Sequence, residues 1–259
     1  MNITIINDCK DDNAAGRQIA RASALFKAPV SLVGVSSDLE AAGNLIDILD
    51  AYDNNPGVIL ANVAPRNGQA KKWPNGTPFG YFRYRNVLIA SSVDGLTLSL
   101  AKKLKLADGI EVLDIPTVVA RFVKEGIVSE EVGRHIVDTQ FRSFDFLPRA
   151  AAYLLKNGTL DSERLPAEEI ADAPQAIWWI DNFGNCKTSI LESELGEGGA
   201  IETKFGRIER FRRLKDVPDG TPALIAGSSG LGAHRFLELA VQGESAARVL
   251  GISSGDLVV

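Results

Sequence analysis

The chain has 259 residues, of which 45% are hydrophobic and 24% charged, which is typical of an ordinary soluble globular protein. Its length allows one large domain or two modest ones, each with its own core. The net charge of −5 argues against a nucleic-acid binder, whose surface would be basic, and no apolar run approaches the roughly 20 residues of a membrane span.

The first half of the chain alternates apolar strand patterns with helical patterns. This alternation predicts an α/β domain with a largely parallel sheet. Ligands of such sheets bind outside the carboxyl ends of the strands, which here carry Asp8, Val63 and Ser91–Ser92. We expect strands at 2–8, 30–36, 57–63, 86–92 and 110–115, and helices at 13–26, 38–50 and 95–104.

The pattern changes near residue 160. The segment 161–174 is polar, acidic and proline-bearing, as linkers are. It would separate an N-terminal domain at 1–160 from a smaller, mostly antiparallel β-domain at 175–259. Short strands are expected in the second domain at 176–181, 186–191, 200–212, 222–227, 236–241 and 255–259.

The segment 178–190, WWIDNFGNCKTSI, is the most informative part of the chain. Aromatic and β-branched residues on both sides of a polar, glycine-containing stretch predict two strands joined by a tight turn. A plain hairpin needs only Asn-Gly or Asp-Gly. This turn instead combines Asp181, Phe183 and Asn185, which suit an ammonium group, a flat ring and a hydrogen-bonding edge.

Other motifs favour simpler interpretations. The glycine-rich GSSGLG at 227–232 fits neither a nucleophile elbow nor a phosphate-binding loop, and a flexible turn is the better interpretation. His135 and His234 have no partners at metal-ligand spacing, so we expect no zinc or iron site. Cys9 has no companion histidine and is expected to pack rather than to act as a nucleophile. With Cys186 as the second cysteine, no disulfide framework exists, which is typical of a cytoplasmic protein.

The segment 66–85 has five cations and five aromatic residues. Two interpretations stay open for it. It is either a solvated connecting loop or a lid over a flat or anionic ligand.

Taken together, these segments resemble the S-adenosylmethionine (SAM)-dependent fluorinase, chlorinase and hydroxide adenosyltransferase family. IDNFGNCKTSI is similar to the family's Asp-x-Phe-Gly-Asn-x-x-Thr-Asn-Ile segment, with Ser189 in place of the second Asn. The closing SSGLGAHRFLELAVQGESAARVLGISSGDLVV is similar to its Asn-Ser-x-Gly, Gly-x-Ser-Ala-Ala and Gly-Asp-x-Val pattern. INDCKDDNAAG, ILANVAPRNGQAKK and VLIASSVDGLTLSL resemble its earlier motifs less closely.

The resemblance implies a trimer whose active sites lie between the N-terminal domain of one subunit and the C-terminal domain of the next. It implies that Asp8 holds the ribose hydroxyls. Asp181 and Ser228 would bind the methionine amino group, and Phe183 and Asn185 would contact the adenine. SAM would be the substrate or ligand, with no further cofactor.

The family's hydroxide-transferring members use an Asp-Arg-His set to orient water, and this chain departs from it. The aspartate position falls on Ala64, the arginine on Lys71 or Lys72, and the histidine on Arg142 or Phe141. Lys71 and Arg142 are therefore the catalytic candidates. Halogenases carry an arginine for the ligand carboxylate where this chain has Ser229, and Arg235 is the nearest replacement.

Two functions of different classes follow. The chain is either an enzyme that transfers the adenosyl group of SAM to water, or a non-catalytic protein that binds SAM or a nucleoside. A repurposed enzyme acting on another nucleoside is a third, weaker possibility. Another acid near the C5′ carbon, such as Asp11, Asp12 or Asp94, would favour the enzyme.

Overall fold

The structure, a computed structural model, describes residues 1–65, 78–195 and 199–259. Lys71 and Lys72, with the first part of the segment at 66–85, lie outside these residues. The chain divides into two compact units, Met1–Ile48 with Tyr52–Ala171, and Leu49–Ala51 with Asp172–Val259. In the part of the chain described, no helix is both long and apolar enough to cross a membrane.

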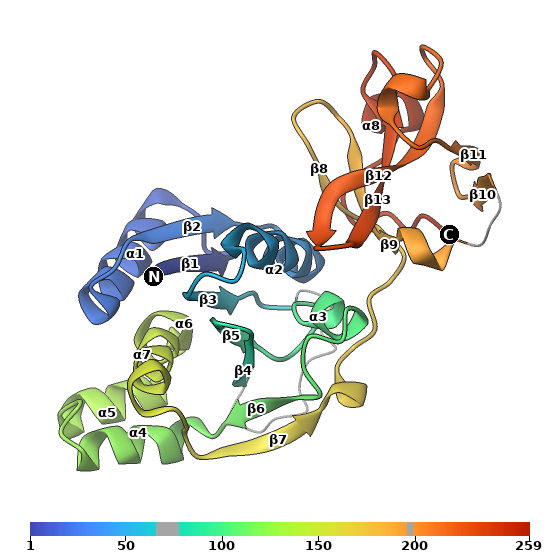
Figure 1. Cartoon of the computed structure of the whole chain (residues 1–259). Coiled ribbons are helices and arrows are strands. Elements are labelled where there is room, and N and C mark those ends of the chain that lie inside the picture. Colours follow the sequence, from blue (N-terminus) through green and yellow to red (C-terminus); the bar gives the residue numbers. More distant parts are fainter. Residues whose placement is uncertain (66–77, 196–198) are drawn as a thin grey trace. The chain divides into compact units, whose positions relative to one another are not determined.

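The N-terminal unit contains a seven-stranded sheet with the strand order β2-β1-β3-β5-β4-β6-β7 (Figure 1). The four neighbours β2, β1, β3 and β5 are parallel, while β4 and β7 run antiparallel to the strands beside them. The expected α/β class with a mostly parallel sheet is therefore confirmed. The strands are β1 (Asn2–Asn7), β2 (Val30–Gly34), β3 (Gly57–Asn62), β4 (Phe79–Tyr84), β5 (Val87–Ser92), β6 (Gly109–Leu113) and β7 (Ser162–Pro166).

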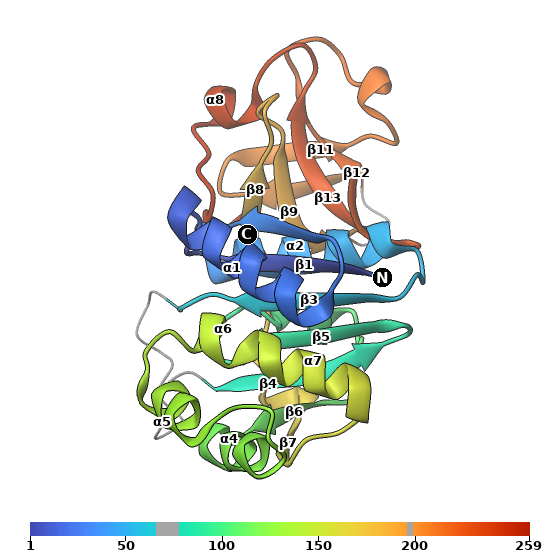
Figure 2. The same ribbon diagram turned by 90° about the vertical axis from the view of Figure 1, so that its left-hand side faces the viewer.

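Helices lie on both faces of this sheet: α1, α6 and α7 on one face, α2 and α3 on the other (Figures 1 and 2). α1 begins where Asp11 accepts hydrogen bonds from the N–H groups of Asn13 and Ala14, a standard N-cap. The side chains of Phe122, Phe146 and Leu154 join the strands in the main core. The helices are α1 (Asp12–Phe26), α2 (Asp38–Tyr52), α3 (Ser99–Lys103), α4 (Ile115–Lys124), α5 (Glu130–Asp138), α6 (Arg142–Asp145) and α7 (Leu147–Asn157).

Two strands of this sheet correct the expectations. The end of the segment at 66–85 is β4, which is hydrogen-bonded between β5 and β6. Its Gly80 is required there, because a Cβ atom would lie 2.6 Å from the side chain of Ile110. The segment 161–174, expected to be a linker, begins with β7, which pairs with β6 through its backbone.

The C-terminal unit contains a six-stranded, mostly antiparallel sheet in the order β10-β11-β12-β13-β9-β8. The β-rich second domain is confirmed, with two local differences. The run at 200–212 is a hairpin of two strands, and the end of the chain makes an isolated bridge between Ala176 and Leu257. The elements are β8 (Ile177–Ile180), β9 (Cys186–Leu191), β10 (Ala200–Thr203), β11 (Gly206–Arg210), β12 (Pro222–Leu231), β13 (His234–Val241) and α8 (Ala246–Leu250).

Candidate functional site

A cavity of about 500 Å³ lies at the carboxyl edge of the N-terminal sheet, where the parallel strands predict a ligand. One side of it follows β1 and β3, and the other is the segment between α5 and α6 together with the ends of those helices. Two of the expected site residues, Asp8 and Arg142, therefore line the same cavity. The lining residues are Asp8, Cys9, Asn62, Val63, Ala64, Phe79, Asp138, Thr139, Gln140, Phe141, Arg142 and Ser143.

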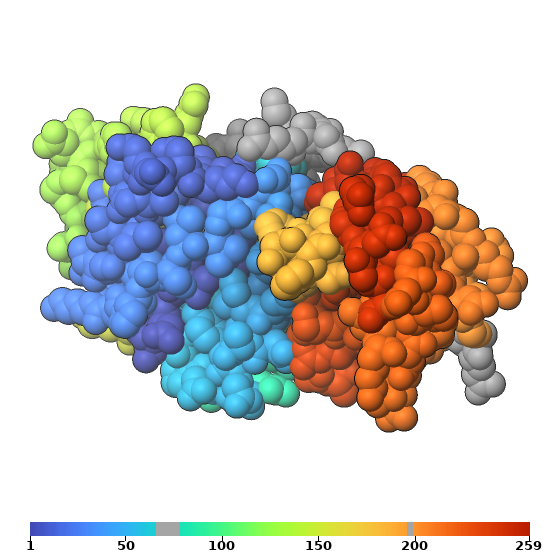
Figure 3. Space-filling model, turned by 90° about the horizontal axis from the view of Figure 1, so that it is seen from above, coloured from blue at the N-terminus to red at the C-terminus, as the bar shows by residue number. Residues whose placement is uncertain are grey.

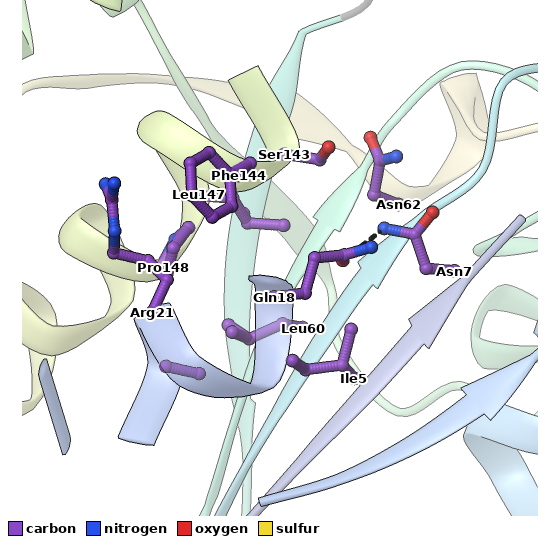
Figure 4. A pocket seen from close by; sticks show the side chains of 11 residues that line it. Ile5, Asn7, Gln18, Arg21, Leu60, Asn62, Ser143, Phe144, Leu147 and Pro148 are labelled. Atoms are coloured by element: carbon purple, nitrogen blue, oxygen red, sulfur yellow. Dashed lines mark hydrogen bonds between the residues drawn. The ribbon is translucent and has the colours of Figure 1, made fainter. Parts of the chain in front are cut away.

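Asp8 is held in place by the buried amide side chains beneath it. Asn7 donates to the Gln18 side chain at 2.6 Å (Figure 4). The Asn7 side chain also accepts from the backbone N–H of Cys9 at 2.8 Å. Gln18 in turn donates to the Cys9 carbonyl at 3.2 Å. The Asp8 carboxylate accepts from the Ala64 N–H at 3.3 Å, across the two parallel strands. The Asp8 carboxylate is thus presented on a preorganised backbone.

The opposite wall is a run of six residues, 138–143, that leaves α5 and enters α6. It offers an acid, a hydroxyl, an amide, an aromatic ring and a cation in turn. The ring of Phe141 is 70% exposed, which is unusual for a large apolar side chain. Arg142 donates to the Val137 carbonyl at 3.5 Å, so its side chain bends back over the end of α5.

Asp145 anchors this wall to the rest of the unit. Its buried carboxylate lies 3.4 Å from Arg21 of α1 and 3.5 Å from His135 of α5. Arg17 and Arg21 also lie over the ring of Phe144, at 4.7 and 4.2 Å from its centroid. Arg21 and Phe144 face each other in the small pocket of Figure 4, which shares Asn62 and Ser143 with the larger cavity. Cation–π contacts and an ion pair therefore join α1 to α6, and the Asp145 carboxylate also lies close to His135 of α5.

The three acids whose approach to C5′ would favour the enzyme do not line the cavity. Asp11 caps α1, and neither Asp12 nor Asp94 lines the cavity. Asp94 follows β5, and burial raises the pKa of its carboxyl group, whose Oδ2 atom has no hydrogen-bond partner among the described residues. Ala64 lines the cavity without any group that could polarise water. Besides Asp8, the acid that lines it is Asp138, which sequence reasoning missed although its position at the end of a helix was visible.

In the C-terminal unit, Asp181 organises the turn between β8 and β9. Its Oδ1 atom accepts from the N–H groups of Phe183 and Asn185, both at 2.9 Å, and its Oδ2 atom accepts from the Asn185 side chain at 3.1 Å. The carboxylate is therefore a turn-forming group first, as an aspartate at this position often is. A carboxylate has about four acceptor sites, so room for one further donor remains.

The same turn presents the ring of Phe183 to solvent, 73% exposed. The turn rests on α8, because the Gly184 carbonyl accepts from the N–H of Ala247 at 2.9 Å. In Figure 3 the yellow surface of the β8–β9 turn lies directly beside the red surface of α8. An exposed aromatic ring on a braced turn is suited to stacking on a flat ligand.

The glycine-rich run at 227–232 is part of β12 and forms an irregularity, not a simple turn. The register of β12 against β13 shifts between Ala226 and Gly230. Ser228, within this irregularity, is exposed, and Ser229 is buried. Arg235 of β13 donates to the carbonyls of Ser228 and Gly230, at 3.1 and 3.4 Å, and so holds the distorted strand. Ser228 is thus the more accessible of the two serines.

Within the residues described, no three histidine, cysteine or acidic side chains gather as a metal site would require.

Comparisons with known proteins bear on the C-terminal half most directly. Residues 175–259 match the model of the SAM hydroxide adenosyltransferase C-terminal domain. This part of the chain is therefore similar to that C-terminal domain. The chain is also 33% identical over 129 residues to the (R)-S-adenosyl-L-methionine hydrolase of Thermus thermophilus. That match covers 46% of this chain and 48% of the relative, so it spans about half the length of each protein. The resemblance to the SAM hydroxide adenosyltransferase family is confirmed.

Two solved structures share the fold over nearly the whole chain. One is an uncharacterized conserved protein from Thermotoga maritima, with a TM-score of 0.67, 17% identity and 98% coverage of both chains. The other is a conserved hypothetical protein from Thermus thermophilus, with a TM-score of 0.64, 23% identity and coverage of 98% of this chain and 96% of that one. At these identities the likeness concerns the fold alone.

Proposed function

We propose that this protein binds SAM and transfers its adenosyl group from sulfur to water at the C5′ carbon, giving adenosine and methionine. The observation that carries the proposal is the match of residues 175–259 to the SAM hydroxide adenosyltransferase domain. The likeness to a curated SAM hydrolase supports it. The cavity at the carboxyl edge of the N-terminal sheet, with Asp8 on its wall, supplies the volume a nucleoside needs.

The roles of the residues follow from their chemistry. Asp8 is suited to the two ribose hydroxyls, because a carboxylate accepts two hydrogen bonds side by side. The exposed Phe183 ring and the Asn185 amide would bind the adenine, and Asp181 with Ser228 the methionine ammonium. We propose SAM as the substrate and no further cofactor.

The reaction demands little acid catalysis, because the leaving group is a neutral thioether. Most of the rate can come from holding a water molecule in line with the breaking C–S bond, which alone is worth up to roughly 7–11 kcal/mol. Arg142, on the cavity wall, can orient such a water or the ligand. Lys71 stays a catalytic candidate, outside the described residues.

The direct test is to incubate the full chain with SAM and separate the products by chromatography. Adenosine and methionine in equal amounts, absent from an enzyme-free control, are the expected result. Formation of 5′-chloroadenosine in chloride buffer would show a halide nucleophile instead. If calorimetry detects no SAM binding and no product forms, the proposal fails.

A second candidate function is binding without catalysis, and Ala64 favours it. The residue lines the cavity at the position where the family's water-orienting aspartate falls, and a methyl group cannot hold water. Under this alternative SAM binds, but it stays intact through long incubation, because no group directs a nucleophile to C5′. The product assay and the binding assay together separate the two functions.

A further inference from the structure

Asp138 is the last residue of α5, and its carboxylate has no hydrogen bond or ion pair within the described part of the chain. An anion at a helix C-terminus opposes the helix dipole, at a cost of about 0.3–1 kcal/mol. The stability of α5 therefore does not explain why residue 138 is an acid. Asp138 is exposed and is one of the residues that line the cavity containing Asp8 and Arg142.

Side-chain contacts connect the segment that carries Asp138 to the neighbouring helices. Thr139 caps α5 and accepts from the Phe141 N–H at 3.0 Å, which shapes the path to α6. Asp145 joins the far end of this segment to α1 and to His135, one turn before Asp138 on α5. A catalytic group requires support from neighbouring elements, and these contacts supply it.

The charges on the cavity wall divide into two sides. Asp8 belongs to the sheet side, where its Oδ2 atom already accepts from the Ala64 N–H. Asp138 and Arg142 belong to the helix side, as an acid and a cation four residues apart. The sheet side thus suits the ribose, and the helix side presents a carboxylate with its acceptor sites still available.

We propose that Asp138 is the catalytic carboxylate of this protein, which binds the attacking water and accepts its proton, in place of the acid missing at Ala64. This inference rests on the proposed function. The water oxygen bonds to C5′ while the C5′–S bond breaks, and the bonding pair stays on the sulfur of methionine. The proton passes to the Asp138 carboxylate and then to solvent, so SAM and water give adenosine, methionine and a proton. Arg142 is the neighbouring cation that orients the same water.

The test compares Asp138→Asn and Asp138→Ala with wild type in the full chain. We expect kcat for adenosine formation to fall by about 100-fold, the range for loss of a general base. The Kd for SAM should stay within about threefold, because Asp138 contacts the water rather than SAM. Glu131→Gln is the matched control, an exposed acid on the same helix that is not among the residues lining the cavity, and it should retain wild-type kcat.

Two further readouts separate catalysis from structure. The pH profiles of kcat for wild type and Asp138→Asn should differ, because only wild type has an acid at position 138. Added formate should partly restore kcat in Asp138→Ala but not raise it in wild type, because a small carboxylate can occupy the vacated space.

The outcomes distinguish this inference from the function on which it rests. If wild type forms adenosine and Asp138→Asn retains full kcat, Asp138 is not the base, although the proposed function stands. If Asp138→Asn loses SAM affinity as much as kcat, the residue binds substrate and the inference is wrong. If wild type binds SAM but forms no adenosine, both the inference and the proposed reaction fail.

Discussion

At the scale of single residues, Asp181 combines two possible roles that a substitution can separate. Its carboxylate already accepts three hydrogen bonds from its own turn. An asparagine at position 181 can keep the two backbone bonds through its amide oxygen. The Asn185 side chain can rotate so that its oxygen accepts a hydrogen bond from the NH₂ group of the new asparagine. Asp181→Asn therefore removes the charge at little cost to the turn.

We predict that Asp181→Asn weakens SAM binding about tenfold to a hundredfold, since a hydrogen bond to a charged group contributes roughly 1.5–3 kcal/mol. Adenosine has no ammonium group and should bind as to wild type. Calorimetry with both ligands measures the difference, and thermal unfolding checks the turn. Equal losses for both ligands, or a lowered Tm alone, would mean that Asp181 acts only within the turn.

The two cysteines should differ strongly in reactivity. Burial raises the pKa of the Cys186 thiol to about 12, with further contributions from Asp181, Glu238 and Asp256. Cys9 is exposed at the cavity wall. At pH 8 we predict that a thiol reagent modifies Cys9 quickly and Cys186 only after unfolding, because the thiolate is the reactive form. Cys9→Ser should abolish the fast phase. Equal rates for both thiols would contradict the burial of Cys186.

The same pKa shift has a consequence for stability at alkaline pH. The ordinary thiol pKa is 9.0, so above this pH the unfolded chain loses a proton that folded Cys186 keeps. The stabilising contribution of the protonated Cys186 thiol to the free energy of unfolding is complete below pH 9 and is lost as the pH rises toward 12.

At the scale of elements, Gly184 determines how the β8–β9 turn meets α8. It has a φ of +86°, and a Cβ atom there would lie 2.0 Å from the hydroxyl oxygen of Ser245, the N-cap of α8. Gly232 also has a positive φ, of +57°, but nothing lies within 4 Å of the place where its Cβ atom would be. Both glycines thus have a positive φ, and they differ in whether a Cβ atom would contact a neighbouring residue.

We predict that Gly184→Ala lowers the free energy of unfolding of the C-terminal unit by about 2–4 kcal/mol, from left-handed strain plus overpacking. Gly232→Ala, which incurs strain alone, should cost about 1–2 kcal/mol. Urea unfolding followed by tryptophan fluorescence measures both. Equal losses would show that the turn can move away from α8.

At the scale of the whole molecule, the oligomeric state follows from the family resemblance. We propose a homotrimer in which Asp8 of one subunit and Phe183 of another contribute to one SAM site. Light scattering should then give a mass near three times the 27.8 kDa of one chain. Mixing Asp8→Ala and Phe183→Ala chains should restore part of the SAM binding that each variant lacks, because some shared sites then contain both intact residues. A monomer at micromolar concentration would rule the shared site out.

Much of this fold could be predicted from the sequence, because the buried strands are visible in it as short runs of apolar residues. β3 and β5 are continuous apolar runs that end in polar residues, and β1 is apolar except for Thr4 between its two ends. This pattern is typical of parallel strands that are covered on both faces. The β8–β9 turn was also predictable, since Asp181 and Gly184 are the residue types its geometry requires. The family resemblance came from such local signals.

Only the tertiary structure decided the elements and contacts that local pattern does not encode. β7 has a single buried side chain, Leu165. It is a strand because its backbone pairs with β6. Backbone pairing does not depend on the polarity of the side chains, so the sequence pattern does not reveal it. The composition of the cavity wall was likewise decided only by the tertiary structure. Asp8 and Asp138 lie far apart in the chain, and no spacing relates them. They share a cavity because the sheet edge and the end of α5 meet there, so folding determines which acids gather at the site.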